Sequence, residues 1–427
     1  MFRLLTAGVT AGVTAGVTVG VTVGITAGAV AAAPVQQPVV DWLGRNAAPG
    51  VTRAMIGQAT VVGLGESAHL THEEATLKFR TVRFLVEEMG FRSIAWEEDW
   101  TAGVMVDDYV LTGRGDLDAL MGELSTTWRT REVRDVLAWL RAYNAAHDDK
   151  VRFVGVEYYA TRALAYDAVS SHVAKAAPHL LGRLQRHLKP LRPRHESTRA
   201  NLEWYMGVRD KRPYLRHARA VHRLVERLPA SPEQRLALHH ARQILSWYEG
   251  FSLADNTAYR DARAAENLRW WQRRTGDKVA YWAASAHTAD APGLRVVLGD
   301  QALTFDSAGS HLRRWYGDRY RSIGFQFDHG TLNAGGGCAS APAQVPRPDP
   351  GFADRVFGDT GLDEYAVDLR APAPEAVRDR LRAPAKVRAY AAYVPAQAQG
   401  SYMTGGSLAQ WFDVIVHRQV ITPCAAL

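Results

Sequence analysis

Four short apolar runs constrain the fold of this chain more than any other feature of its sequence. They cover residues 59–64, 92–96, 151–156 and 278–284, and the first two flank a stretch, residues 71–89, with apolar residues at helical spacing. Runs that are apolar throughout are typical of strands covered by helices on both faces. Strands that alternate with helices form βαβ units. The sequence therefore predicts an α/β fold with a mostly parallel sheet flanked by helices.

Residues 178–251 differ from the rest because they contain no convincing strand. Their leucines recur at helical spacing, and five prolines divide the stretch into pieces. We expect a helical insertion here, within an α/β domain made of residues 34–177 and 252–427. Short strands are expected in the C-terminal third at residues 320–327, 387–393 and 412–416, and a short helix is expected over residues 39–54.

The first 33 residues have the pattern of a targeting segment. After Arg3 no charged residue follows until Asp41, and between them lie a tandem Thr-Ala-Gly-Val repeat and an Ala-rich end with small residues at 29–31. A basic start, an uncharged stretch and a small-residue site form a secretory signal. Glycine and threonine make this stretch a weak membrane span, and no other run approaches the ~20 apolar residues a span needs. We expect a secreted chain without a stable membrane span; a retained anchor and a misassigned start codon are the alternatives.

The charge pattern and the cysteines exclude some classes. The net charge is +7, but only 7 of the 51 basic residues are lysines, and the arginines are scattered among acidic residues. Without a basic stripe interleaved with aromatic residues, we expect no nucleic-acid partner. Cys338 and Cys424 lack CxxC spacing, which argues against a zinc ribbon. In an exported protein they either pair, closing a long loop, or remain free.

The four apolar runs end at titratable side chains. Glu66 and His69 follow the first run, Glu97 the second, Glu157 the third, and His287 lies just beyond the fourth. In open parallel sheets, ligands bind beyond the carboxyl ends of the strands. If these strands are parallel neighbours, the five side chains converge on one cleft. The sequence therefore predicts a single site at this edge of the sheet.

Three chemistries compete for this site. A serine nucleophile needs a Gly-x-Ser-x-Gly elbow, and residues 65–69 lack its second glycine, so Ser67 is better interpreted as a cap or an anion-facing residue. Metal-dependent hydrolysis would use His69, His72 and His287, but no HExxH motif occurs. In the remaining option His69 deprotonates a water, carboxylates fix its tautomer, and His287 or an arginine stabilises the oxyanion. That option needs no cofactor, in keeping with a sequence without P-loop, dinucleotide or haem motifs.

Other polar residues are weaker candidates. Lys78 and Arg80 lie on the helix after His69; one of them could reach an anionic transition state, although helix cations are more often exposed. His239 and His240 are expected at the surface of the helical insertion. Asp328 follows an expected strand and fits a turn better than a cleft wall.

Several segments together resemble the erythromycin esterase family. Residues 63–69, Gly-Leu-Gly-Glu-Ser-Ala-His, carry the resemblance most clearly. It extends in the same order along residues 38–420. The other matching segments are the helix with Lys78 and Arg80, 84–92, 95–97, 154–157, 260–261 with 266–267, 282–287 and 412–413.

The resemblance implies an α/β fold with a helical subdomain and metal-independent hydrolysis of a macrolide lactone ester, with no cofactor. His69 matches the family's general-base histidine, and Glu66 and Glu97 match its active-site carboxylates. His287 matches the second histidine of the family's His-x-x-His element. Further candidates to support the substrate are Glu157, Lys78, Arg80 and Arg260.

The chain also departs from the family pattern. Ala284 replaces the first histidine of the His-x-x-His element, Ala264 replaces a usual methionine, and Glu157 stands where an aspartate is common. These changes bear on the substrate more than on the fold, because the base and its carboxylates remain. We expect a hydrolase of a small-molecule ester or lactone, such as a macrolide antibiotic, a natural product or an envelope ester. The alternatives are a non-catalytic ligand-binding protein on the same scaffold, which the loss of one histidine favours, and a metal-dependent hydrolase.

Overall fold

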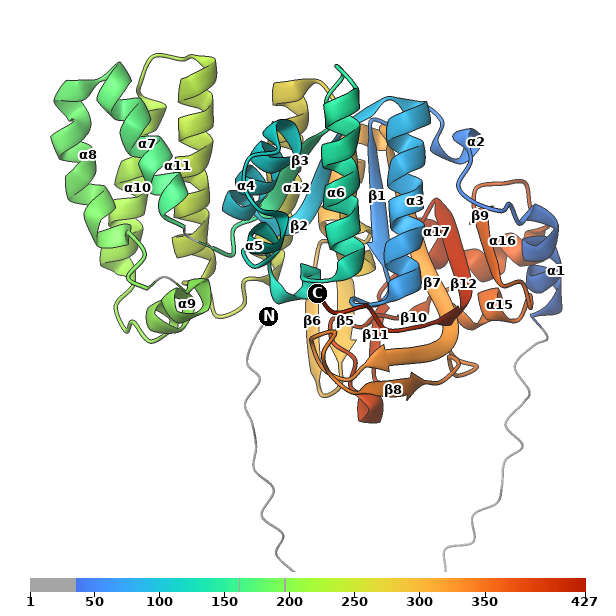
Figure 1. Ribbon diagram of the computed structural model, residues 1–427. Helices are drawn as coiled ribbons and strands as arrows, with labels where there is room; N and C mark the ends of the chain where they lie inside the picture. The colour runs from blue at the N-terminus through green and yellow to red at the C-terminus, as the bar shows by residue number, and fades with distance from the viewer. Residues whose placement is uncertain (1–35, 161, 196) are drawn as a thin grey trace, which may run out of the picture.

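The computed structural model describes residues 36–160, 162–195 and 197–427, so the leader expected at 1–33 lies outside the described part of the chain. In this part, eight strands form a central sheet in the order β3–β2–β4–β1–β7–β12–β9, with β8 paired to β7 (Figure 1). Their bounds are β1 Val61–Glu66, β2 Phe91–Asp99, β3 Arg152–Glu157, β4 Lys278–Ala284, β7 Tyr320–Asn333, β8 Pro342–Val345, β9 Glu364–Asp368 and β12 Val414–Ile421.

The sheet is mostly parallel, as the sequence predicts. The pairs β2–β3, β2–β4, β1–β4, β1–β7 and β7–β12 are parallel, whereas β8 and β9 run antiparallel to their neighbours. The register places Glu66 at the end of β1 opposite Ala284 of β4 and Phe325 of β7. The carboxyl ends of the four predicted strands therefore lie along one edge of the sheet.

Helices cover both faces of this sheet (Figure 1). Val62 and Leu64 of β1 pack in one apolar cluster with α3 (His72–Met89) and α6 (Arg131–Ala146). Val61 points the other way, into a cluster with α12 (Thr257–Thr275) and α14 (Ala308–Tyr316). Because successive side chains of a strand point to opposite faces, β1 is apolar at almost every position. The same burial explains why the four central runs predict strands correctly.

A helical unit stands beside the sheet (Figure 1). It consists of α7 (Ala163–Ala176), α8 (Leu181–Leu188), α9 (Thr198–Met206), α10 (Arg212–Glu226) and α11 (Pro232–Gly250). These helices share one apolar cluster, whose residues extend from Tyr158 to Tyr259. Besides the expected stretch 178–251, this cluster thus includes α7, which packs on α8 and α11.

The prediction that His239 and His240 lie at the surface is wrong. Both lie on α11 and are buried. The His239 ring stacks on Trp270 with 3.7 Å between ring centroids, and Nδ1 of His240 accepts a hydrogen bond from the indole of Trp100 at 3.1 Å. Helical spacing identifies α11 as a helix, but it does not show that this face contacts tryptophans from α12 and from the start of α4 (Trp100–Thr112).

A second, smaller sheet lies beside the first. It is antiparallel, with the order β10 (Lys386–Arg388), β11 (Ser401–Thr404), β5 (Leu294–Leu298) and β6 (Gln301–Phe305). The helix expected over 39–54 is two helices, α1 (Gln37–Asn46) and α2 (Arg53–Ile56). The remaining helices are α4 (Trp100–Thr112), α5 (Leu117–Met121), α13 (Ser285–Thr288), α15 (Arg355–Gly358), α16 (Glu375–Arg382) and α17 (Leu408–Trp411). None of the helices in the described ranges is long and apolar enough to cross a membrane.

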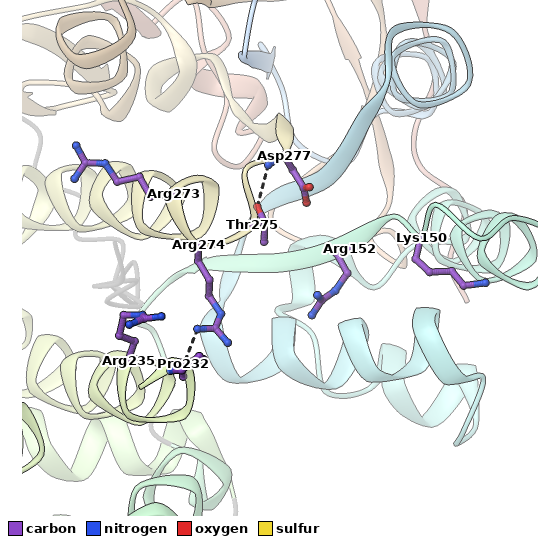
Figure 2. Close-up of a pocket in the computed structure, with 8 residues that line it drawn as sticks. All are labelled: Lys150, Arg152, Pro232, Arg235, Arg273, Arg274, Thr275 and Asp277. Atoms are coloured by element: carbon purple, nitrogen blue, oxygen red, sulfur yellow. Dashed lines mark hydrogen bonds between the residues drawn. The ribbon is translucent and has the colours of Figure 1, made fainter. Parts of the chain in front are cut away.

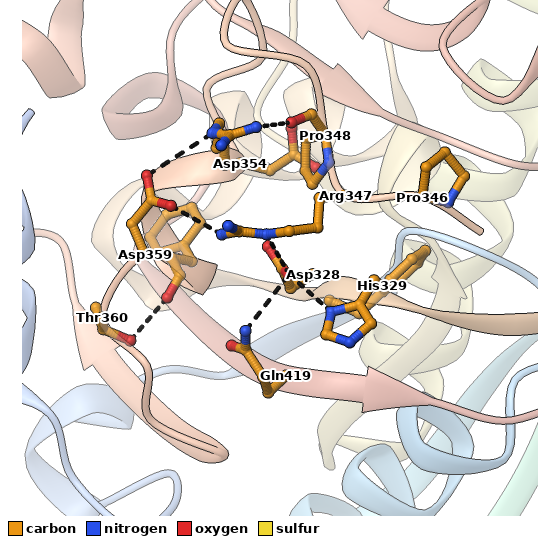
Figure 3. A network of polar contacts seen from close by, with 12 residues as sticks. Asp328, His329, Pro346, Arg347, Pro348, Asp354, Asp359, Thr360 and Gln419 are labelled. Atoms are coloured by element: carbon orange, nitrogen blue, oxygen red, sulfur yellow. Dashed lines mark hydrogen bonds and ion pairs between the residues drawn. The ribbon is translucent and has the colours of Figure 1, made fainter. Parts of the chain in front are cut away.

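Asp328 does not lie in a turn, so that prediction is also wrong. It is buried within β7, which continues to Asn333. Oδ2 of Asp328 accepts a hydrogen bond from Nε of Arg347 at 2.7 Å and lies 2.8 Å from Nδ1 of His329 (Figure 3). Arg347 also pairs with Asp359. These contacts hold the loop after β8 against the middle of β7.

The two cysteines form a disulfide. Cys338 and Cys424 are 86 residues apart in sequence, and their Cα atoms lie 5.5 Å apart. The bond joins the loop after β7 to the last residues of the chain. Of the two alternatives that the sequence leaves open, the structure has the paired one.

Candidate active site

The carboxyl ends of four adjacent strands bring the predicted side chains together. Glu66 is the last residue of β1, Glu97 lies near the end of β2, Glu157 ends β3, and His287 lies in α13 directly after β4. All four are buried. Short polar contacts join them in two groups, one around His69 and one around His287.

The first group is a histidine held by a carboxylate. Nδ1 of His69 lies 2.7 Å from Oε1 of Glu66, and the other Glu66 oxygen forms an ion pair with Lys78. An anionic carboxylate can only accept hydrogen bonds, so Nδ1 of His69 carries a hydrogen and donates a hydrogen bond to Glu66. This leaves Nε2 of His69 as the nitrogen with a free lone pair, which is the form a general base needs.

Lys78 is buried and does not have the exposed position typical of helix cations. Its ammonium lies 4.4 Å from the ring centroid of Trp282 and donates a hydrogen bond to the carbonyl of Ala283 at 3.2 Å. A buried cation needs a partner, and Glu66 provides it. Lys78 thus fixes the carboxylate that orients His69. Burial holds the pKa of Lys78 well below its usual value, with the Glu97 charge acting in the opposite direction.

The loop between β1 and α3 is tied down by Glu74. Oε1 of Glu74 accepts hydrogen bonds from the main-chain N–H and the hydroxyl of Ser67, at 3.1 and 2.7 Å. Oε2 accepts from the N–H of Ala68 at 3.0 Å and the hydroxyl of Thr71 at 3.4 Å. Leu70 in the same loop has φ +67°, a left-handed conformation that non-glycine residues rarely adopt. The four donors thus hold a strained turn that sets the position of His69.

His69 is set up to be uncharged at neutral pH. Burial lowers its pKa from the usual 6.5, and Arg260 acts in the same direction, while Glu97 and Glu74 oppose this. The indole of Trp128 meets the His69 ring edge-on, with 5.3 Å between centroids, and excludes water from that side. A neutral imidazole can accept a proton from water.

The second group surrounds Glu97. Its Oε1 lies 2.5 Å from a terminal guanidinium nitrogen of Arg260 and 3.4 Å from Nε2 of His287. Its Oε2 accepts a hydrogen bond from the main-chain N–H of Ala284 at 2.9 Å. Arg260 also donates from Nε to Glu157 at 3.0 Å. Because this hydrogen bond comes from the main chain of Ala284, the replacement of the family histidine by alanine does not remove it.

His287 has the opposite charge preference to His69. Burial and Arg260 would lower its pKa, but Asp261 and Glu97 outweigh them and raise it above 6.5. Asp261 lies 2.9 Å from Nδ1 of His287 and also accepts a hydrogen bond from the N–H of Ala308 at 2.8 Å. His287 is therefore suited to be the protonated donor, and His69 the neutral acceptor. Two titratable groups with pKa values pushed apart are the pattern of an acid and a base at one site.

The carboxylates of this group differ as well. Burial would raise the pKa of Glu97, but His287, Arg260 and His69 outweigh it and hold the pKa well below its usual value. For Glu157 burial dominates and raises the pKa to about 7; Arg260 and His287 oppose this rise, and the Glu97 charge adds to it. Glu97 is therefore the permanent anion of the site.

Sequence reasoning missed some contributing residues and included one that lies elsewhere. Asp261 and Glu74 lie within helices, where a lone acid gives no local signal; Asp261 appeared only in the family-like segment 260–261. Arg80 lies outside the cluster: its side chain is 60% exposed and pairs with Glu364 at 2.6 Å. His72 is half-exposed and contacts Glu132 at 2.8 Å. In the described ranges, no group of three or more His, Cys, Asp and Glu side chains is arranged to hold a metal ion.

The fold and this cluster define an α/β protein with a histidine–carboxylate site at the carboxyl edge of its sheet. A family model described as erythromycin esterase matches residues 86–420. The chain belongs to the erythromycin esterase family, and membership supports a hydrolase that acts on ester bonds. The resemblance noted in the sequence is thus confirmed.

Individual relatives agree with this assignment. The chain is 24% identical over 298 residues to an erythromycin esterase type II of Escherichia coli, covering 64% of this chain and 70% of the relative. A crystal structure of a Bacillus cereus protein has a TM-score of 0.80 at 25% identity, covering 92% of this chain and 99% of the other. A mutant of the erythromycin esterase EreC in its open conformation has a TM-score of 0.66 at 18% identity, covering 87% and 93% of the two chains, and shares the fold.

Proposed function

We propose that this protein is an exported hydrolase that cleaves an ester or lactone by general-base activation of water, with His69 as the base. The observation that carries the proposal is the opposite tuning of the two buried histidines. The pKa of His69 is lowered, and its Nδ1 is occupied by Glu66. The pKa of His287 is raised, and Asp261 and Glu97 contact its ring.

The proposed reaction has two steps. In the first, Nε2 of His69 removes a proton from water while the water oxygen attacks the carbonyl carbon of the substrate, giving a tetrahedral oxyanion. His287 donates a hydrogen bond to that oxyanion. In the second step the intermediate collapses, the C–O bond to the alcohol breaks, and the imidazolium of His69 returns its proton to the leaving alkoxide. The products are a carboxylic acid and an alcohol, and His69 is neutral again.

Three further observations support the substrate class and the location. The E. coli relative is named an erythromycin esterase, which makes a macrolide lactone the first substrate class to test. The uncharged, small-residue leader supports export, where the protein would meet a macrolide or an envelope ester outside the membrane. The disulfide between Cys338 and Cys424 fits an oxidising compartment.

A turnover screen tests the proposal. Purified protein is incubated with a panel of macrolides and simple lactones, and products are detected by mass spectrometry. We expect a product heavier by one water, and we expect His69→Ala to lower kcat about a hundredfold or more, since general-base catalysis contributes that much. The matched control is His179→Ala, because His179 is exposed in the helical unit, away from the sheet.

Two outcomes would contradict the proposal. A folded His69→Ala variant with unchanged kcat would remove His69 from the role of base. No hydrolysis product anywhere in the panel would contradict lactone hydrolysis. Circular dichroism of each variant separates loss of chemistry from loss of fold.

A further inference from the structure

A basic groove lies at the amino ends of β3 and β4, opposite the candidate active site. Figure 2 shows the side chains that line it. The groove encloses a cavity of about 770 Å³. One wall of this cavity is formed by Lys150 and Arg152 at the start of β3 and by Asp277 just before β4. The start of α11 and the end of α12 form the other walls, with Pro232, Arg235, Arg273, Arg274 and Thr275. The active-site side chains lie at the opposite, carboxyl ends of the same strands. The proposed hydrolysis therefore does not use this groove.

Positive charge dominates the groove. An adjoining cavity of about 420 Å³ shares Arg235, Arg273 and Arg274 and adds Arg269 and Glu266. The lining of the two cavities thus contains six cations and two carboxylates, a surplus of four positive charges in a chain whose whole net charge is +7.

The two carboxylates already have partners. Oδ2 of Asp277 accepts a hydrogen bond from the hydroxyl of Ser93 at 2.5 Å. Glu266 forms an ion pair with Arg263, on the neighbouring turn of α12. The acids that line the groove are therefore engaged with other groups.

Among the residues that the structure describes, Arg152 pairs with Asp107, whereas the other five cations have no carboxylate partner. Lys150 donates to the carbonyls of Asn144 and His147, and Arg274 to the carbonyl of Pro232 at 3.1 Å. In the described part of the chain no ion pair is found for Arg235 or Arg273. Burial lowers the pKa of Arg274, and its neighbours Arg235 and Arg152 lower it further, against the opposing effect of Glu233. The guanidinium groups repel one another, and a ligand with several negative charges would reduce this repulsion.

The side chains that line the groove indicate which class of ligand it could bind. Five of the six cations are arginines, whose planar fork of N–H donors matches the oxygens of a phosphate group. The cavity volume falls in the range of small-molecule sites, roughly 300–1,000 Å³. We propose that this groove binds a small ligand with two or more linked phosphate groups.

The tryptophans in the wall favour this ligand over a nucleic acid. His239 already stacks on Trp270 at 3.7 Å, and Arg269 lies over Trp315 at 4.4 Å. Single-stranded nucleic acids bind by stacking bases on open aromatic faces. The groove, as far as its residues are described, has no free aromatic face on which a base could stack. Its cations would therefore recognise the ligand through the phosphate groups.

Isothermal titration calorimetry of the purified full chain with inorganic triphosphate tests the proposal. We expect saturable 1:1 binding that weakens as the salt concentration rises, since the attraction is between exposed charges. The double variant Arg235→Gln, Arg273→Gln removes two exposed cations that have no ion pair and should weaken binding about tenfold or more. The matched control is Arg45→Gln, which removes an exposed arginine of α1 on the other side of the molecule and should leave the affinity unchanged (Figure 1).

Other results would overturn the proposal. No saturable heat with triphosphate, or the same affinity in the double variant and the wild type, would show that the groove is not a phosphate site. Tighter binding of a ten-residue oligothymidylate than of triphosphate would assign the surface to nucleic acid instead. Because the variants lie far from His69, unchanged esterase activity would show that they are folded.

Discussion

At the residue scale, two buried imidazoles of one site differ because of the charges that face them. His69 has one carboxylate at its Nδ1, and that carboxylate is neutralised by Lys78. His287 lies between Asp261 and Glu97. Burial acts on both rings in the same direction, so the difference in pKa comes from these partners.

The pH dependence of the reaction should expose this difference. The wild type should show an acid limb where His69 becomes protonated, below pH 6.5, and an alkaline limb where His287 loses its proton, above 6.5. Asp261→Asn removes a charge that raises the pKa of His287, so the alkaline limb should move to lower pH. The asparagine carbonyl can still accept the hydrogen bond from Ala308. The pH profile of kcat/KM measures both limbs, and the acid limb is the internal control; an alkaline limb that stays in place would contradict the role of Asp261.

The site residues that the sequence could predict share a position in the fold. Glu66, Glu97 and Glu157 each lie at or near the end of an apolar strand, and such ends are visible in a single sequence. Glu74 and Asp261 act from within helices, and only the folded chain shows that they meet the turn after β1 and the ring of His287. The buried position of Lys78 could not be predicted either, because helical spacing does not tell which cation of a helix points into the core.

At the element scale, the turn between β1 and α3 depends on a single carboxylate. Both oxygens of Glu74 accept hydrogen bonds from main-chain N–H groups, at Ser67 and at Ala68. Burial raises the pKa of Glu74 to about 7, with the hydrogen bonds from Ser67, Ala68 and Thr71 acting in the opposite direction. Four donors on two oxygens favour the anion.

Replacement of this carboxylate by an amide should therefore loosen the turn. In Glu74→Gln the amide nitrogen must face one of the two main-chain donors, leaving a buried N–H without an acceptor at a cost of about 1–3 kcal/mol. We expect a lower free energy of unfolding in urea and a lower kcat, because His69 loses its fixed position. Glu87→Gln, at an exposed position on the same helix, is the control. Equal kcat in the two variants would argue against a positioning role for Glu74.

The strands that the sequence did not predict share a physical feature. Edge strands such as β6 expose most of their residues, and β11 has only four residues. Short, half-exposed strands do not produce a long apolar run, and β11 pairs with β5, which lies far away in sequence. Their existence depends on tertiary contacts more than on local pattern.

At the scale of the whole molecule, features that are assembled from distant segments could not be predicted from the sequence. The basic groove gathers cations from residues 150–152, 235 and 269–274, which look scattered along the chain. The end of the chain is a second case. Cys424 donates its N–H to the carbonyl of Leu70 at 2.9 Å, and Thr422 accepts a hydrogen bond from the N–H of His72 at 3.0 Å. The last residues therefore lie along the turn that carries His69.

The disulfide ties this terminal segment to the loop after β7, and its loss should affect both stability and catalysis. Closing a loop of 86 residues restricts the unfolded chain, so the double variant Cys338→Ser, Cys424→Ser should lose up to about 4 kcal/mol of unfolding free energy. We also expect a lower kcat under conditions where the variant is still folded, because the segment that supports Leu70 is no longer anchored. Urea denaturation and kcat measure the two effects, and wild type treated with dithiothreitol should match the variant. If stability falls while kcat stays at the wild-type value, the segment stabilises the fold without positioning His69. The turn is then held by Glu74 and by the main-chain hydrogen bonds that join Ser67 and His69 to Tyr390.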